Sequence, residues 1–218
     1  CILSRGLGDV YKRQAPSLWE LIDLICSDDP HLECTSFIQH AQASRYFRHS
    51  KTHEGDCFHL PSAASREGRF RRAELAQRNH GVRPVSNFNL VGAAQVGKSS
   101  LTGMRMLHQL RDTIKVWPID PLPHTGPVLV EIYTAIAARR GGMAKGRTKI
   151  REFTALNAAL KQLESPSVPG EGSIDDHSSD ALITAAWLRN AAKDPKNWRP
   201  AGLTEHISRT EGWTFGAV

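Results

Sequence analysis

The amino-acid sequence predicts an α/β domain in which helices and strands pack in layers. Hydrophobic residues make up 40% of the 218 residues and charged residues 23%, which is typical of a folded globular chain and excludes a long disordered polyelectrolyte. Short apolar runs with the length of strands alternate along the chain with longer segments whose apolar residues recur at helical spacing. This alternation predicts the α/β class.

Four features are expected in the first half of the chain. Residues 16–26 carry apolar side chains at helical spacing behind a proline, which predicts a helix. Residues 27–84 are polar, rich in histidine and arginine and weakly periodic, so we expect a loop-rich insertion with a short helix at 67–79. The apolar run at 87–91 predicts a strand, and the pattern at 98–110 predicts a helix after it.

The second half of the chain predicts strands at 114–117 and 128–133, followed by two helices. A basic, glycine-rich link at 139–148 leads into the first helix, at 149–163, and a loop with two prolines and two glycines follows it. The second helix spans 176–192. Its expected apolar side comprises Ala181, Ile183, Ala185, Trp187 and Leu188.

The two ends of the chain give different signals. Residues 1–14, CILSRGLGDVYKRQ, show neither helical nor strand periodicity and no signal-peptide order, and GLGDVYKRQ resembles translated sequencing-adapter read-through. A disordered native tail is the alternative interpretation. The closing residues 211–216, EGWTFG, form a short apolar stretch that we expect to pack back on the sheet. We therefore expect one domain over residues 15–218, with its first strands replaced by the adapter-like segment.

Cysteine usage and hydropathy predict a cytoplasmic protein without a membrane partner. No stretch approaches the roughly 18 consecutive apolar residues that a membrane span needs. Outside residues 1–14 the cysteines are Cys26, Cys34 and Cys57. This odd set without a CxxC pair favours reduced thiols and a cytoplasmic location.

Residues 49–59 hold four side chains of the types that bind zinc: His49, His53, Cys57 and His59. Their spacing lacks the paired ligands of structural zinc sites. We interpret the segment as a polar loop, with a zinc site as the alternative.

The chain carries a formal net charge of +6, and its 19 arginines outnumber its 9 lysines. Guanidinium groups suit phosphate contact because their fork binds two oxygens at once. The basic residues form two clusters. One comprises Arg66, Arg69, Arg71, Arg72 and Arg78; the other comprises Arg139, Arg140, Lys145, Arg147, Lys149 and Arg151. The second cluster is the candidate nucleic-acid contact surface, and a solvated face is the alternative.

The phosphate-binding pattern GxxxxGK[ST] is matched through Gly92, Gly97, Lys98 and Ser99. An expected strand precedes it and an expected helix follows it, which is the context in which backbone amides and a lysine hold phosphates. Too few strands follow to complete a P-loop sheet, and no aspartate is well placed to hold Mg²⁺. A P-loop nucleotide-binding protein is therefore an alternative function, and a tight strand-to-helix turn is the preferred interpretation.

A quieter group of residues suits divalent-metal chemistry. Glu131 lies within the apolar run VLVEIY, which predicts a buried central strand, where a carboxylate is costly unless it is paired or binds a metal. Asp175, Asp176, His177 and Asp180 open the last predicted helix, and Asp176 shares a face with Asp180. N-capping explains Asp175 and Asp176 but not Asp180 or Glu131. Strand and helix carboxylates together predict a Mg²⁺ or Mn²⁺ site that acts on a phosphoryl group.

The motifs VLVEIYT, DDHSSDALITAAWLR and EGWTFG together resemble the predicted RNase H-like nucleases of domain-of-unknown-function family 429, relatives of the RuvC-type resolvases. The resemblance covers residues 87–218. It implies a mixed sheet flanked by helices and a two-metal nuclease in which Glu131 is the strand glutamate and Asp180 the helix aspartate, with Asp176 or His177 as companion. The segment QVGKSSLTGMRML also resembles a family element, which counts against the P-loop interpretation.

Two departures from the family pattern affect the expected activity. Thr134 stands where the pattern has proline, and no upstream residue supplies the first-strand aspartate of the family's metal site. The resemblance therefore implies an incomplete RNase H-like sheet and an inactive fragment of a metal-dependent nuclease that acts on DNA or RNA. A non-catalytic nucleic-acid-binding module with the same fold is the remaining alternative.

Overall fold

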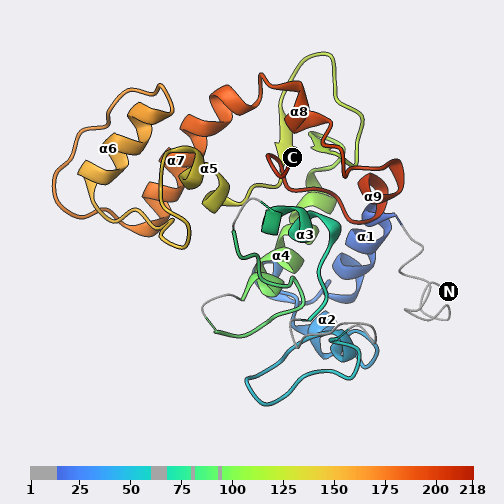
Figure 1. Ribbon diagram of the computed structural model, residues 1–218. Helices are drawn as coiled ribbons and strands as arrows, with labels where there is room; N and C mark the ends of the chain where they lie inside the picture. Colours follow the sequence, from blue (N-terminus) through green and yellow to red (C-terminus); the bar gives the residue numbers. More distant parts are fainter. Residues whose placement is uncertain (1–13, 60–67, 80–81, 93–94) are drawn as a thin grey trace. The chain divides into compact units, whose positions relative to one another are not determined.

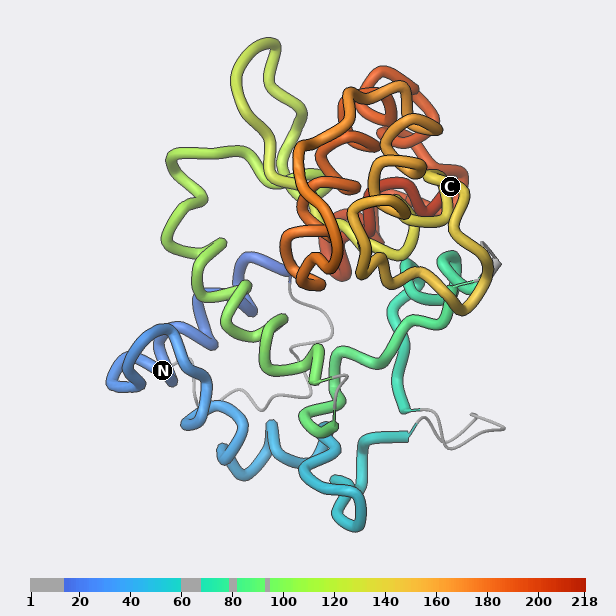
Figure 2. The backbone as a smooth tube through the Cα atoms, turned by 90° about the vertical axis from the view of Figure 1, so that its left-hand side faces the viewer, coloured from blue at the N-terminus to red at the C-terminus, as the bar shows by residue number. Residues whose placement is uncertain are grey.

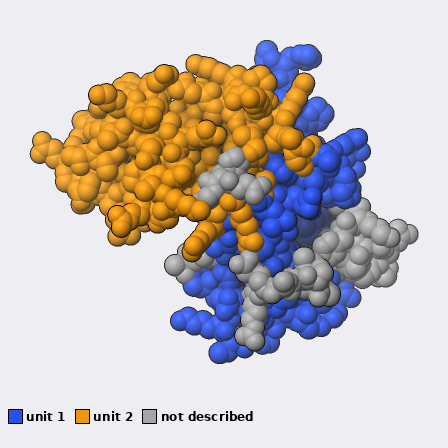
Figure 3. All heavy atoms as spheres, viewed as in Figure 1, with its two compact units in different colours: residues 1–75, 84–129, 204–213 blue, residues 76–83, 130–203, 214–218 orange. Residues whose placement is uncertain are grey.

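The computed structural model describes residues 14–59, 68–79, 82–92 and 95–218, and 46% of this part is helical (Figure 1). Besides these helices the described residues contain a small two-stranded sheet. The predicted mixed α/β class is therefore confirmed. The adapter-like residues 1–13 and the start of the predicted helix at 67–79 lie outside the described residues. By its internal contacts the chain divides into two compact units, coloured separately in Figure 3.

Unit 1 comprises residues 1–75, 84–129 and 204–213. Its elements are α1 (Ala15–Ile25), η3 (Pro30–Leu32), α2 (Thr35–Gln39), η4 (Ser44–Tyr46), α4 (Val96–Leu110), β1 (Lys115–Trp117) and α9 (Glu205–Thr210). Helices α1 and α4 pack on each other and bury Ile22 and Leu101. The helices predicted at 16–26 and 98–110 are therefore confirmed.

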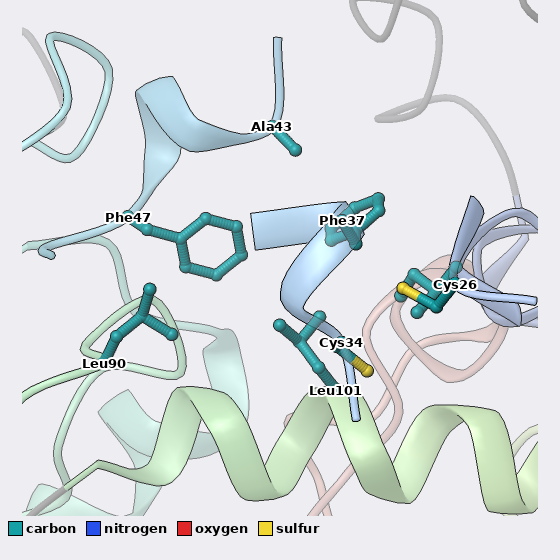
Figure 4. Close-up of a cluster of buried hydrophobic side chains, with 8 residues drawn as sticks. Cys26, Cys34, Phe37, Ala43, Phe47, Leu90 and Leu101 are labelled. Carbon is teal, nitrogen blue, oxygen red and sulfur yellow. The ribbon is translucent and has the colours of Figure 1, made fainter. Parts of the chain in front are cut away.

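The core of unit 1 is a cluster of buried apolar side chains (Figure 4). Its members are Ile22, Cys26, Cys34, Phe37, Ala43, Phe47, Leu90 and Leu101. Phe37 and Phe47 meet edge to face with ring centroids 6.4 Å apart, a favoured aromatic geometry. The segment predicted as a loop-rich insertion contributes four of these residues, Cys34, Phe37, Ala43 and Phe47, of which only Phe37 lies inside a helix.

One buried cation fixes the turn that leads out of α1. Arg105 of α4 is only 4% exposed, and its Nε donates to the Asp23 carboxylate at 2.8 Å. The same guanidinium donates to the backbone carbonyl of Glu33 at 2.6 Å. A buried charge is tolerated when it is paired and hydrogen-bonded in this way, so Arg105 holds residues 29–33 against α4.

The sheet consists of β1 and β2 (Val128–Val130), which run parallel. Figure 2 traces the ten residues between them, 118–127, as an extended loop. The predicted strands at 114–117 and 128–133 are confirmed in shortened form. The prediction of a buried central strand is wrong, because the three residues of β2 are only half-buried and Glu131 is exposed.

The predicted strand at 87–91 is also wrong. This segment is a turn whose only ladder contact among the described residues is a single bridge between Asn89 and Arg48. The amide of Phe88 donates to the Ser86 hydroxyl, and the Asn89 side chain donates to the carbonyl of Val91. Such local side-chain bonds compete with a strand ladder, which explains why an apolar run with two asparagines turns instead.

Unit 2 comprises residues 76–83, 130–203 and 214–218. Its helices are α5 (Thr134–Arg140), α6 (Phe153–Gln162), α7 (Asp176–Ala191) and α8 (Pro195–Trp198), and α3 (Arg72–Asn79) runs from unit 1 into unit 2. Helices α5 and α6 both pack against α7, as Figures 1 and 2 show. The closing segment adds Phe215, which is fully buried against the rings of Trp187 and Trp198.

Three predictions for this half of the chain need correction. The link at 139–148 begins inside α5, a helix that the sequence analysis missed, and α6 starts at Phe153 because Glu152 pairs with Ser173 in an isolated bridge. Ala181 and Ala185 lie exposed on α7, where Ser179 and Thr184 are buried in their place. The helix at 176–192 and the loop at 164–173 are confirmed.

In the part of the chain that the structure describes, no helix is long and apolar enough to cross a membrane.

Alkylation with iodoacetamide at pH 8 is expected to modify Cys57 and to spare Cys26 and Cys34 in the folded protein. Burial raises the pKa of the Cys34 thiol to about 12 and also raises that of Cys26, so neither forms the reactive thiolate at this pH. Cys57 is only half-buried. Peptide mass spectrometry would follow each site, with denatured protein as the fully reactive control. Equal rates for Cys34 and Cys57 in buffer would contradict the packing of the cluster.

Candidate functional site

Acidic residues stabilise the first turn of α7. Asp175 is the N-cap, and its carboxylate accepts from the backbone amide of Ser178 at 2.9 Å. Hydrogen bonding by Ser178 lowers the pKa of Asp175. Asp176 follows in the first turn, where a negative charge is favoured by the helix dipole. Capping by Asp175 therefore explains why α7 begins here. Asp176 and Asp180 lie half-buried in its first two turns.

Two carboxylates of α7 gather around one lysine. The Nζ atom of Lys149 lies 2.9 Å from Oδ2 of Asp180 and 3.7 Å from Oδ2 of Asp176. The hydrogen bond with Asp180 raises the pKa of Lys149, with a smaller contribution from Asp176. Nε of Arg151 lies 3.6 Å from the other oxygen of Asp176. Two of the three predicted metal ligands, Asp176 and Asp180, thus pair with two of the predicted nucleic-acid contacts.

Asp180 has a further partner on α5. The hydroxyl of Thr134 donates to Oδ2 of Asp180 at 3.3 Å, the same oxygen that accepts from Lys149. Thr134 is the first residue of α5 and lies three residues after Glu131. Because three residues span at most about 10 Å, this contact keeps Glu131 in the neighbourhood of the α7 carboxylates.

Glu131 is held by the closing segment of the chain. Its backbone carbonyl accepts from the amide of Phe215 at 2.8 Å, and its Oε1 accepts from the hydroxyl of Thr214 at 2.8 Å. Nε2 of Gln77 donates to the same hydroxyl at 2.7 Å. A carboxylate can only accept, so the single hydroxyl proton of Thr214 points to Glu131, and Gln77 must be the donor on the other side. Thr214 and Gln77 are buried, whereas Glu131 is exposed.

The three predicted acids do not form one cluster. Among residues 14–59, 68–79, 82–92 and 95–218, no group of three histidine, cysteine, aspartate or glutamate side chains is arranged to hold a metal ion. His177 is exposed. Asp176 and Asp180 lie near one common position, which the ammonium of Lys149 occupies. Mg²⁺ typically takes one or two protein carboxylates and completes its shell with water and phosphate oxygens.

Three basic side chains of the second cluster are exposed and have no side-chain partner among the described residues: Arg140, Lys145 and Arg147. Arg139 instead donates to the carbonyl of Met143 at 2.7 Å. The loop starts at Gly141, where a Cβ would lie 3.0 Å from Ile183 and 3.1 Å from Ala159. This close packing anchors the base of the loop on α6 and α7 and leaves its basic residues in solvent.

Most of the net charge belongs to unit 2. It holds 13 lysines and arginines against 8 aspartates and glutamates, whereas unit 1 holds 15 against 14. Two residues of the first basic cluster are used in internal contacts: Arg69 donates to the carbonyl of Cys57, and Arg71 pairs with Glu74. Arg66 lies outside the described residues. The positive charge available to an anion is therefore concentrated in unit 2.

The geometry at the GxxxxGK[ST] pattern favours the turn interpretation. The amide of Gly97, one of those that a P-loop would offer to a phosphate, donates to the carbonyl of Asn89 at 3.0 Å. A Cβ on Gly97 would lie 2.7 Å from the carbonyl oxygen of Asn87. Lys98 and Ser99 are exposed on α4, and Gly92 has a positive φ of 77°. Close approach of α4 to residues 87–89 thus explains the second glycine.

The zinc-type side chains at 49–59 have other partners. A ring nitrogen of His49 lies 2.8 Å from the carbonyl oxygen of Ser44, and one of His59 lies 2.9 Å from a carboxylate oxygen of Glu54. The segment forms a loop, as predicted.

Sequence reasoning missed Thr134, Thr214 and Gln77 as side chains that hold the candidate acids. Thr134 was visible as a departure from the family pattern, and Thr214 lies inside the quoted EGWTFG motif. Nothing in the sequence singles out Gln77, whose partner is 137 residues away.

Searches against family models, curated proteins and solved structures found no match to this chain.

Replacing Gly97 with alanine is expected to destabilise the protein by about 1–3 kcal/mol, because the added methyl overpacks the contact with Asn87 and Asn89. The matched control is Gly103→Ala in the same helix, where a Cβ meets nothing within 4 Å. That change should stabilise the protein by up to about 1 kcal/mol through helix propensity. Urea unfolding measures both. Equal changes in unfolding free energy for Gly97→Ala and Gly103→Ala would contradict the packing explanation. ATP binding that depends on Lys98 would support the P-loop interpretation instead.

Proposed function

We propose that this chain is part of an RNase H-like, metal-dependent nuclease, in which Asp176 and Asp180 hold a Mg²⁺ or Mn²⁺ ion. The basic segment at 139–148, which comprises the end of α5 and the loop after it, binds the nucleic-acid backbone. The observation that carries the proposal is the pair of α7 carboxylates gathered around the positive charge of Lys149. The exposed cations of the loop belong to the same unit. The motifs that resemble family 429 supply the reaction class.

The proposed chemistry is hydrolysis of a phosphodiester. The oxygen of a water molecule bonds to phosphorus, one bridging P–O bond breaks, and one water proton ends on the departing oxygen. The ion at Asp176 and Asp180 would neutralise charge on the phosphate oxygens. Arg140, Lys145 and Arg147 would hold the neighbouring phosphates.

Glu131, the strand glutamate that the resemblance implies, does not cluster with Asp176 and Asp180 and is not given to their ion in this proposal. Thr214 fixes its carboxylate, so Glu131 is oriented before any ligand arrives. The acid that the resemblance places on a first strand is absent, which predicts that this chain alone binds both ligands without cleaving nucleic acid.

Removing either α7 carboxylate is expected to weaken metal binding. Asp176→Asn or Asp180→Asn should weaken Mn²⁺ binding by at least about tenfold, since carboxylate charge sets the affinity of such sites. The electron paramagnetic resonance signal of free Mn²⁺ measures the binding. Asp194→Asn is the matched control, because Asp194 caps α8 elsewhere in the unit and asparagine also caps. Unchanged Mn²⁺ binding in Asp180→Asn would refute the site.

Cleavage assays with Mn²⁺ separate the remaining possibilities. Turnover by this chain that Asp180→Asn removes would support the nuclease and contradict the expected inactivity. Salt-sensitive nucleic-acid binding in the absence of any Mn²⁺ binding would assign a non-catalytic binding module instead.

Removing the positive charges of Arg140, Lys145 and Arg147 is expected to weaken nucleic-acid binding and to reduce the dependence of that binding on salt. The triple variant Arg140→Gln, Lys145→Gln, Arg147→Gln should reduce the slope of log K against log salt concentration by about 2–3, because each lost phosphate contact releases about one counterion fewer. Fluorescence anisotropy of labelled DNA and RNA over a salt series measures the slope.

The control for the loop variant changes three other exposed cations of unit 2: Lys161→Gln, Lys193→Gln and Arg199→Gln. Both triple variants lose the same net charge. Equal slopes for the two would show that general attraction, rather than the loop, binds the backbone.

A further inference from the structure

We propose that the carboxylates of Asp176 and Asp180 compete with nucleic-acid phosphates by holding the ammonium of Lys149. This inference rests on the nucleic-acid-binding part of the proposed function and needs no metal ion. While Lys149 is paired with α7, it is withheld from the contact surface to which the sequence assigns it. The contact is therefore autoinhibitory, because the protein binds a phosphate backbone less tightly than its cations would allow.

Lys149 differs from the other cations of its segment in what it faces. Three of them are exposed without a side-chain partner among the described residues: Arg140, Lys145 and Arg147. The Nζ atom of Lys149 instead lies 2.9 Å from Oδ2 of Asp180 and 3.7 Å from Oδ2 of Asp176. A carboxylate and a phosphate offer an ammonium the same kind of acceptor, an anionic oxygen. The contacts with α7 thus take the place of contacts with a phosphate.

The segment around Lys149 is held against α7 independently of the ion pair. The next residue, Ile150, is only 2% exposed and so anchors the segment by its side chain. The carbonyl of Arg151 accepts from the amide of Ile174 at 2.9 Å, two residues before α7 begins. Both contacts remain when the two carboxylates are neutralised. The ammonium then keeps its place beside α7 and becomes available to a phosphate.

The ion pair is of a strength with which a phosphate can compete. The side chain of Lys149 is 52% exposed and that of Asp180 is 22% exposed, so water screens their attraction. An exposed ion pair typically changes an equilibrium by about 1.5- to 5-fold. Arg151 adds less to the same effect, because its Nε lies 3.6 Å from Asp176 and its side chain is 74% exposed. The competition should therefore reduce nucleic-acid affinity without abolishing it.

The test removes the two carboxylates and measures nucleic-acid binding in EDTA, so that no metal ion takes part. The double variant Asp176→Asn, Asp180→Asn should bind short labelled DNA and RNA duplexes about 3- to 10-fold more tightly than wild type. Asparagine keeps an acceptor for the hydroxyl of Thr134, so that contact is preserved at position 180.

The matched control is the double variant Glu171→Gln, Asp194→Asn. It removes two exposed carboxylates of the same unit that pair with no cation among the described residues, and asparagine still caps α8. Both double variants have the same net charge. The control should change the affinity by less than about twofold, because it releases no cation.

A double-mutant cycle shows whether the gain comes from Lys149. The slope of log K against log salt concentration counts phosphate contacts, at about 0.9 per contact. Lys149→Gln should leave this slope unchanged in the wild type, where α7 holds the lysine. In the Asp176→Asn, Asp180→Asn background the same change should reduce the slope by about 1. Fluorescence anisotropy measures the slopes, and thermal unfolding checks that each variant is folded.

The outcomes separate this inference from the proposed function. Equal slope losses for Lys149→Gln in the two backgrounds, or an equal gain in affinity for the control, would refute the competition and leave the nucleic-acid surface standing. If neither wild type nor the variant without the α7 carboxylates binds the duplexes, the nucleic-acid-binding part of the proposed function fails and the competition fails with it.

Discussion

The arrangement of unit 2 depends on the hydrogen bond from the Phe215 amide to the Glu131 carbonyl. It joins the end of β2 to the closing segment of the chain, whose Phe215 ring is fully buried against Trp187 of α7 and Trp198 of α8. A Cβ on Gly216 would lie 2.5 Å from the Trp187 ring, so only glycine allows this approach. One short segment therefore fixes Glu131 relative to the helix that carries Asp176 and Asp180, although 49 residues separate Glu131 from Asp180 in the sequence.

The structure changes the reasons for expecting a metal. The sequence predicts a metal site because helix capping does not account for the presence of Asp180 or Glu131, and because Glu131 is expected in a buried strand. Asp180 now has partners in Lys149 and Thr134, and Glu131 is an exposed acceptor of the Thr214 hydroxyl. The two α7 acids face two cations, Lys149 and Arg151, so their charges are balanced within the protein. A divalent ion at this pair therefore stays a proposal.

Sequence periodicity located α1, α4, α7 and both strands of the sheet, because each has a long or strongly apolar pattern. It failed at 87–91, where Ser86 and the asparagines satisfy backbone groups locally, and it missed α5, whose seven residues are hidden beside a glycine-rich stretch. For the site, the acids and basic residues were found by type, but their pairing was not. Which cation faces which carboxylate depends on how the loop at 139–148 folds onto α7, and a single sequence carries no such long-range information.

Thr134 has two roles, at the start of a helix and as a partner of Asp180. The resemblance has proline at this position, and Thr134 is the first residue of α5. Proline is favoured at the first position of a helix because its missing N–H has no intrahelical acceptor there and its φ suits the helix. Threonine leaves the helix start unchanged and adds a hydroxyl, which donates to Asp180. Thr134 therefore both begins α5 after Glu131 and gives Asp180 a neutral donor, which proline could not provide and which helps to orient the carboxylate beside Lys149.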